Sequence, residues 1–174
     1  MTRKVLVFDT SVLCCWLRIP GKDKAGPDHD QWDFNRVDKL INEELGSRNT
    51  LFVLPIASLI ETGNHIAKCP GNRYLLANTL TNHLLASVNT TSPWAAFSHQ
   101  NALWEPENLQ ELASIWPTLA VGGTSIGDAT IKHVAEHYAK AGFNVEILTG
   151  DQGLKAYQPL RPSLVPRRRS GRIN

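Results

Sequence analysis

Three short apolar runs divide the chain, and polar or turn-forming residues follow each of them. The runs at positions 5–8, 51–54 and 145–148 are rich in Val, Leu, Ile and Phe, which is typical of buried strands. The first run ends at Asp9 and the second at Pro55. The pattern therefore predicts three buried strands, each leading into a new element.

Between these runs, apolar residues recur every three or four positions, which indicates amphipathic helices. The expected buried faces are Val37, Leu40, Ile41 and Leu45; Leu76, Leu80 and Leu84; Leu109, Leu112, Ala113 and Trp116; and Ile131, Val134, Ala135 and Tyr138. Pro106 suits the first turn of the third helix, and Gly142 follows the fourth as a natural stop. Because parallel strands need crossover helices, this alternation predicts an α/β domain with a mainly parallel sheet.

Two stretches do not fit the alternation. Residues 19–31, rich in Pro, Gly, Asp and Lys, are expected to form a loop. Residues 89–104 hold Trp94, Phe97 and Trp104 among Ser, Thr and Asn, and are expected to form an insertion or to include a short strand. The three rings could stack on unpaired bases, but packing in the core or at a protein interface is the favoured interpretation.

Composition indicates one folded domain with a basic tail. With 42% hydrophobic and 20% charged residues, the 174-residue chain is neither disordered nor a coiled coil. The net charge of +2 conceals an asymmetry, since residues 161–174 hold five arginines and no acid. Residues 1–160 keep 13 of the 18 basic residues against all 16 acids, a net charge of −3. We therefore expect a single domain over 1–160 and an Arg-rich tail over 161–174.

The sequence also bears on location and redox state. No apolar run approaches the roughly 18 residues of a membrane span, and the N-terminus does not have the pattern of a secretory signal, so we expect a soluble, cytoplasmic protein. Three cysteines without zinc-site spacing are expected to be reduced thiols, with Cys14 and Cys15 on or beside the core.

Four acidic residues fall where a parallel sheet binds its ligands. Asp9 and Asp151 follow strands directly, Glu61 lies six residues past Pro55, and Asp128 opens the last long helix. In open parallel sheets, ligands bind outside the carboxyl ends of the strands. We therefore expect these four carboxylates to lie on one edge of the sheet.

Each acid also has an ordinary structural explanation. The alternatives are N-caps or turn residues at Asp9 and Asp151, a capping box between Ser125 and Asp128, and a solvated helix position for Glu61, paired with Lys68 or His65. Taken together, however, the four acids present a charge problem, because two carboxylates 4 Å apart repel by about 4 kcal/mol at an effective dielectric constant of ~20. A cluster of three or four needs a cation or a shared proton.

The chemistry of such a cluster points to a hard divalent cation. Oxygen ligands without Cys suit Mg²⁺ or Mn²⁺, which also bind substrate phosphate oxygens. The metal would lower the pKa of a water and neutralise charge developing on the phosphate. The sequence therefore predicts a cleft that binds a metal against a phosphodiester.

The stretches around the four acids resemble the PIN-domain nuclease superfamily, which includes the VapC-type toxin ribonucleases of bacterial toxin–antitoxin pairs. The matching residues are Val7-Phe8-Asp9-Thr10-Ser11, Ile60-Glu61-Thr62-Gly63-Asn64, Gly127-Asp128-Ala129 and Leu148-Thr149-Gly150-Asp151. The resemblance covers about residues 4–157. It implies a three-layer α/β/α sandwich with a central, mainly parallel sheet.

The resemblance also implies an activity and residue roles. The activity is Mg²⁺- or Mn²⁺-dependent endonucleolytic cleavage of RNA, less often DNA, leaving 5′-phosphate and 3′-hydroxyl ends. The implied roles are metal binding and catalysis for Asp9, Glu61, Asp128 and Asp151, and orientation of carboxylates or substrate for Thr10, Ser11 and Thr149. The implied biological role is that of a toxin or defence effector, controlled by an antitoxin or other regulatory protein.

Two departures from the family pattern stand out. The chain is longer than the small toxins, mainly through residues 19–31 and 89–104. The helix that Asp128 opens continues as Ala129-Thr130-Ile131-Lys132, without the further acid or Asn that some members carry, so the number of metals, one or two, stays open. The sequence does not fix the oligomeric state, although a homodimer is compatible with it.

Several polar residues have open assignments. Asn64 could touch substrate or steady Glu61, and His65 could carry protons, but ordinary hydrogen bonding is favoured for both. His133 and His137 are expected to be surface residues rather than a zinc pair. In the tail, Arg167, Arg168, Arg169 and Arg172 could contact RNA, dock onto an acidic partner or form a solvated end.

Two rival functions remain. One is a catalytically silent scaffold that binds RNA or protein, which four crowded acids argue against. The other is a metal-dependent phosphatase with Asp9 as nucleophile. Asp9-Thr10-Ser11 lacks the second Asp of the haloacid-dehalogenase-like phosphatases, and no Walker-type phosphate loop is present.

Overall fold

The computed structural model describes residues 3–160, so the predicted arginine contacts of the tail lie outside the described residues. The helices are α1 (Thr10–Trp16), α2 (Phe34–Ser47), α3 (Ile56–Lys68), α4 (Arg73–Val88), α5 (Pro106–Val121), α6 (Ile126–Lys140) and α7 (Gln152–Ala156), with 3₁₀ helices η1 (Asp28–Asp30) and η2 (Phe97–Trp104). The strands are β1 (Lys4–Phe8), β2 (Lys24–Ala25), β3 (Trp32–Asp33), β4 (Thr50–Val53) and β5 (Asn144–Leu148).

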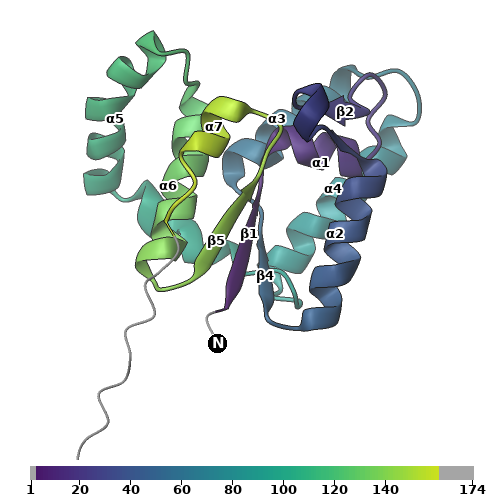
Figure 1. Cartoon of the computed structure of the whole chain (residues 1–174), viewed down its shortest axis with the longest axis horizontal. Coiled ribbons are helices and arrows are strands. Elements are labelled where there is room, and N and C mark those ends of the chain that lie inside the picture. The colour runs from purple at the N-terminus through teal and green to yellow at the C-terminus, as the bar shows by residue number, and fades with distance from the viewer. Residues whose placement is uncertain (1–2, 161–174) are drawn as a thin grey trace, which may run out of the picture.

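The three predicted strands form one parallel sheet. Its order is β4-β1-β5, with Val5 opposite Leu51 on one side and Val145 on the other. The strands run in the same direction, so their carboxyl ends share one edge (Figure 1). The prediction of an α/β domain with a parallel sheet is therefore confirmed.

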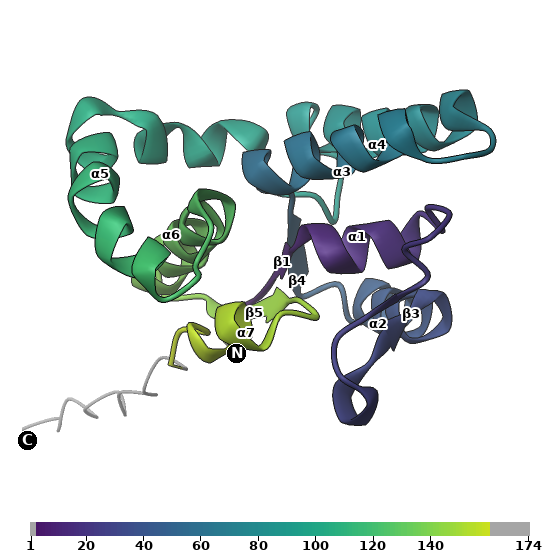
Figure 2. The same cartoon turned by 90° about the horizontal axis from the view of Figure 1, so that it is seen from above.

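Alternate residues of β1 face two different helical layers. Leu6 and Phe8 pack in one core cluster with residues of α1 and α2, whereas Val5 and Val7 pack in another with residues of α6. Seen from above, α6 lies on one side of the strands and α1 and α2 lie on the other (Figure 2). The order helix, sheet, helix is consistent with the predicted three layers.

The helical periodicity predicts α6 well and two other helices less well. All four predicted core residues of α6 are buried. Leu45 and Leu109 are instead 44% and 40% exposed, and Ala113 is exposed too, so the prediction is wrong for them. Leu45 lines a surface hollow beside Thr50. Leu109 and Ala113 belong to α5, which packs against α6 and η2 rather than on the sheet (Figure 1).

The two irregular stretches contain local structure that the sequence did not predict in detail. Within 19–31, β2 pairs with the following β3 as a small antiparallel hairpin, where a loop was expected. Within 89–104, Trp94 forms a parallel bridge with Phe52 beside β4. The Phe52 N–H donates to the Pro93 carbonyl at 2.9 Å, which extends the sheet by a single bridge. Trp94 is buried against Phe8 and Phe52, so core packing is confirmed for this ring.

The fold also bears on the predictions about membrane-spanning segments and cysteines. Across residues 3–160, none of the helices combines the length and apolar character that crossing a membrane requires. Cys14, Cys15 and Cys69 are unbridged, as predicted for reduced thiols, and Cys14 and Cys15 are buried in the core as expected.

Candidate active site

The four predicted acids line one cavity at the carboxyl edge of the sheet. Asp9 follows β1, Glu61 lies in α3, Asp128 lies in the first turn of α6, and Asp151 follows β5. The cavity measures about 290 Å³, and we call it the acidic cavity. Its other lining residues are Thr10, Ser11, Cys14, Lys22, Lys24, Ala25 and His65. Segments far apart in the sequence thus contribute to a single site.

Asp9 is the most buried of the four acids, with 5% of its surface exposed. Its Oδ2 accepts hydrogen bonds from the Ser11 hydroxyl at 2.5 Å and the Thr149 hydroxyl at 2.8 Å. Burial raises the pKa of the Asp9 carboxyl above its ordinary value, although the hydrogen bonds from Ser11 and Thr149 oppose this shift. The carboxylate is therefore fixed in orientation and costly to ionise without a nearby cation.

The same hydroxyl groups also join the ends of β1 and β5. The Ser11 hydroxyl accepts a hydrogen bond from the Gly150 N–H at 3.0 Å, and the Thr149 hydroxyl accepts one from the Asp151 N–H at 2.9 Å. Each hydroxyl thus donates to Asp9 and accepts from a backbone N–H of the segment that follows β5. This network holds the segment around Asp151 against the segment around Asp9.

Glu61 reaches the cavity from α3, with its carboxylate pressed against the start of α6. It accepts a hydrogen bond from the Thr10 hydroxyl at 2.9 Å. A Cβ atom at Gly127 would lie 2.5 Å from Glu61 Oε1, so the glycine leaves room for the carboxylate. Glu61 was alternatively expected to be a solvated helix residue paired with Lys68 or His65. Within residues 3–160, it forms no ion pair with either of them.

The other three acids cap helices, as their ordinary explanation predicted. Asp9 accepts from the Ser11 N–H at the start of α1, and Asp151 accepts from the Leu154 N–H at the start of α7. Asp128 forms a capping box with Ser125, whose hydroxyl lies 2.7 Å from the carboxylate. Capping and cavity lining thus occur together, because each cap places its carboxylate at the edge where helices begin.

The donor chemistry of the cavity fits a hard divalent cation. Carboxylate and hydroxyl oxygens line it, and Mg²⁺ prefers one or two carboxylates completed by waters and phosphate oxygens. Among the described residues, no three His, Cys, Asp or Glu side chains are grouped closely enough to hold a metal ion by themselves. Asp9, Glu61, Asp128 and Asp151 are the side chains that could contribute ligands.

The two candidates that follow Glu61 in the sequence differ in position. Asn64 is exposed and is not among the residues that line the cavity. His65 does line it. Burial and then the charge of Lys22 lower the pKa of the His65 imidazole, while Glu61 acts in the opposite direction. His65 is therefore biased toward its neutral form.

Sequence reasoning missed the residues that residues 19–31 bring to the site. Lys22, Lys24 and Ala25 line the cavity, although this stretch was expected to be only a loop. The indole N–H of Trp32, on the paired strand, donates to the Thr149 carbonyl at 3.0 Å. The one sequence feature that could have indicated these residues is the presence of lysines in a Gly- and Pro-rich stretch. That feature does not predict where the side chains lie in the fold.

An apolar groove of about 600 Å³ borders the acidic cavity and shares Glu61 with it. Its remaining lining comes from α3, η2, α5 and α6, and includes Phe97 and Trp104. Trp104 is 37% exposed there. Of the three aromatic residues in 89–104, two therefore face this groove while Trp94 is buried in the core.

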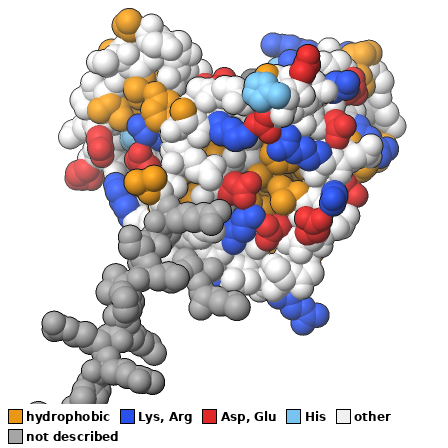
Figure 3. Space-filling model, in the orientation of Figure 1, with side chains coloured by type: hydrophobic (Ala, Val, Ile, Leu, Met, Phe, Trp, Pro, Cys, Tyr) orange, Lys and Arg blue, Asp and Glu red, His pale blue; other side chains and the backbone are white. Residues whose placement is uncertain are grey.

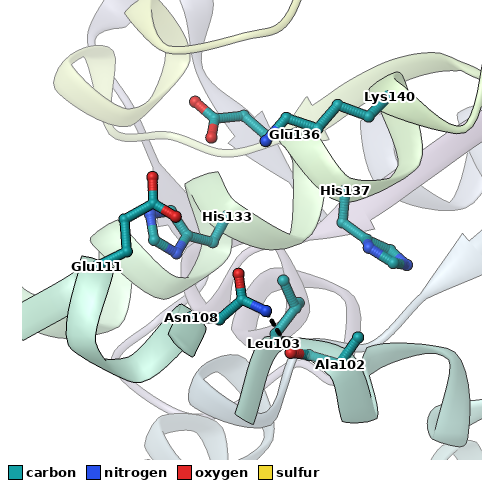
Figure 4. A pocket seen from close by; sticks show the side chains of 8 residues that line it. All are labelled: Ala102, Leu103, Asn108, Glu111, His133, Glu136, His137 and Lys140. Atoms are coloured by element: carbon teal, nitrogen blue, oxygen red, sulfur yellow. Dashed lines mark hydrogen bonds between the residues drawn. The ribbon is translucent and has the colours of Figure 1, made fainter. Parts of the chain in front are cut away.

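A third hollow, of about 180 Å³, lies between α5, α6 and η2, and we call it the α5–α6 pocket. It contains Glu111, His133, Glu136 and His137 (Figure 4). The His133 ring points toward Glu111, whereas His137 points away from both (Figure 4). The two imidazole rings therefore diverge, and both side chains are half-buried, whereas surface positions were expected.

Acidic and basic side chains are intermixed on the face shown in Figure 3, without a large field of one sign. No protein-family model, curated protein sequence or solved structure matches the chain.

Proposed function

We propose that the protein is a divalent-metal-dependent endoribonuclease of the PIN type, with the acidic cavity as its active site. One observation carries this proposal. Asp9, Glu61, Asp128 and Asp151, from four separate segments, line the same cavity at the carboxyl edge of a parallel sheet. That edge is where open α/β sheets bind ligands.

The residues of the cavity have distinct tasks in this proposal. Asp9 and Glu61 are held by hydroxyl groups that fix their direction before substrate arrives. Such preorganisation makes ligands effective, because no reorganisation is needed during the reaction. Asp128 and Asp151 complete the acidic wall from the first turn of α6 and the N-cap of α7. One or two of these carboxylates, with waters and phosphate oxygens as the remaining ligands, would hold Mg²⁺ or Mn²⁺ and thereby orient the scissile phosphate.

The chemistry that a bound cation would supply is activation of water and neutralisation of charge on the phosphoryl group. His65 is biased toward its neutral form at the edge of the cavity and could accept a proton. The products of this reaction are a 5′-phosphate and a 3′-hydroxyl. The preference for RNA, the toxin or defence role and control by an antitoxin or other regulatory protein rest on the resemblance to the PIN superfamily.

A panel of substrates tests the proposal. Purified full-length protein is incubated with labelled single-stranded RNA, structured RNA, single-stranded DNA and a small phosphate monoester, with Mg²⁺, Mn²⁺ or EDTA. Cleavage of RNA that depends on metal and leaves 5′-phosphate ends supports the nuclease. Binding of RNA without cleavage in any metal would instead indicate a scaffold, and release of phosphate from the monoester alone would indicate a phosphatase.

A further inference from the structure

Two lysines share the acidic cavity with the four carboxylates. Lys22 and Lys24 line it from the segment that ends in the β2–β3 hairpin. Neither forms an ion pair anywhere in residues 3–160. Both lysines are also exposed. Their positively charged side chains are therefore available to an anion.

The influence of Lys22 on its neighbours supports this placement. Burial raises the pKa of the Cys14 thiol to about 12, and the charge of Lys22 is the strongest influence against that shift. The same lysine lowers the pKa of His65. Since Cys14 and His65 both line the cavity, the positive charge of Lys22 acts inside it.

The hairpin, which begins at Lys24, lies with its backbone directly against the turn that follows β5. At Gly150, an added Cβ atom would lie 2.6 Å from the Gly26 N atom and 2.8 Å from the carbonyl carbon of Ala25. Gly26 also has φ of +89°, a conformation that favours glycine. Two glycines thus allow β2 to lie directly against the turn that carries Asp151.

Side chains also connect the hairpin to its neighbours. The Trp32 indole donates to the Thr149 carbonyl at 3.0 Å. Asp30 accepts from Arg36 Nη2 at 2.9 Å and also pairs with Lys155 of α7. The segment that carries the lysines therefore has defined contacts with α2 and with the segment that joins β5 to α7.

We propose that Lys22 and Lys24 bind backbone phosphates of the RNA strand as it enters the acidic cavity. This inference rests on the proposed function and deepens it. Residues 1–160 carry a net charge of −3, whereas binding to nucleic acid draws most of its non-specific affinity from neutralised phosphates. Two unpaired lysines beside the carboxylates supply that positive charge where the strand must approach.

Binding and cleavage are measured separately to test the inference. The probe is fluorescein-labelled oligouridylate, and its affinity for the full-length protein is measured by anisotropy in EDTA and in Ca²⁺, from about 50 to 200 mM salt. The test variant is Lys22→Gln/Lys24→Gln. The matched control is Lys39→Gln/Lys140→Gln, which removes the same charge at exposed positions outside the cavity.

The expected loss follows from counterion release. With a slope of about 0.7 per phosphate for single strands, each lost contact lowers affinity about fivefold at 0.1 M salt. We expect a loss of about 25-fold in the test variant, a shallower salt dependence, and recovery in Lys22→Arg/Lys24→Arg. The control should bind like the unmodified protein.

Three results would overturn the inference: an unchanged salt dependence in the test variant, an equal loss in the control, or no measurable binding by the unmodified protein. The proposed function is tested by cleavage in Mg²⁺ or Mn²⁺ instead. Failure to cleave with intact lysine-dependent binding would reject the nuclease and retain the phosphate contacts.

Discussion

The acidic cavity and the α5–α6 pocket both gather side chains that can bind metals, but they differ in how those side chains are held. In the acidic cavity, Asp9 and Glu61 receive hydrogen bonds from hydroxyl groups on other residues. In the α5–α6 pocket, neither His133 nor His137 has a side-chain hydrogen bond within residues 3–160, and the rings diverge. The hydrogen bonds that orient the side chains, rather than the residue types, therefore distinguish the acidic cavity from the α5–α6 pocket.

Removing one carboxylate charge from each region should give the largest difference in RNA cleavage. Glu61→Gln and Glu111→Gln both neutralise an exposed glutamate with little change in shape. We expect Glu61→Gln to lower RNA cleavage by about 10²-fold or more, the scale of a lost electrostatic contact in a preorganised site. Glu111→Gln should retain full activity in the same single-turnover assay. Similar losses in the two variants would show that the regions are not functionally different.

A second comparison concerns the close approach of the hairpin to the cavity. Gly150→Ala places a Cβ atom against the backbone of Gly26 and Ala25, and such overpacking costs about 1–3 kcal/mol of unfolding free energy. Gly63→Ala, at a helical position with nothing within 4 Å, should instead add about 0.5–1 kcal/mol. Urea denaturation measures both. A neutral Gly150→Ala variant would show that the hairpin can move without cost.

The sequence predicted the part of the site that depends on local pattern. Strand ends located Asp9 and Asp151, because a run of apolar residues followed by a polar turn marks the edge of a parallel sheet. Helical spacing located Glu61 within two turns of the same edge. These positions follow from regular geometry, so they can be read without knowledge of the packing.

The remaining features depend on contacts between distant segments. Strands of two residues, such as β2 and β3, are too short to show a periodic pattern. The close approach of the hairpin to Gly150 could therefore not be predicted from the sequence. Lys22 and Lys24 reach the cavity only through that approach. The exposure of Leu109 similarly depends on α5 packing on α6 rather than on the sheet.

The ion pairs of Asp30 with Arg36 and Lys155 should give the weakest effect, a pH dependence of stability. Hydrogen bonds from Lys155 and Arg36 lower the pKa of the Asp30 carboxyl from 3.8 to about 2. A lowered pKa stabilises the folded state above pH 3.8, and this contribution is lost as the pH falls through about 2. Asp30→Asn should cost below about 1 kcal/mol for each pair at neutral pH.

The direction of this pH dependence is checked by measuring the unfolding free energy of the unmodified protein and of Asp30→Asn at several acidic pH values. The difference in unfolding free energy between the unmodified protein and Asp30→Asn should shrink between pH 3.8 and about 2. A difference that stays constant across that range would mean that ionisation of Asp30 does not stabilise the fold.

Asp9 is the most buried carboxylate of the acidic cavity, which we propose to be a metal-dependent nuclease site. The most direct measurement is cleavage of labelled single-stranded RNA by the unmodified protein and by Asp9→Asn, with Mg²⁺, Mn²⁺ or EDTA, after circular dichroism has shown that both are folded. We predict metal-dependent cleavage that falls by about 10²–10³-fold in Asp9→Asn. Cleavage that persists in EDTA, or that Asp9→Asn retains in full, would contradict the assignment.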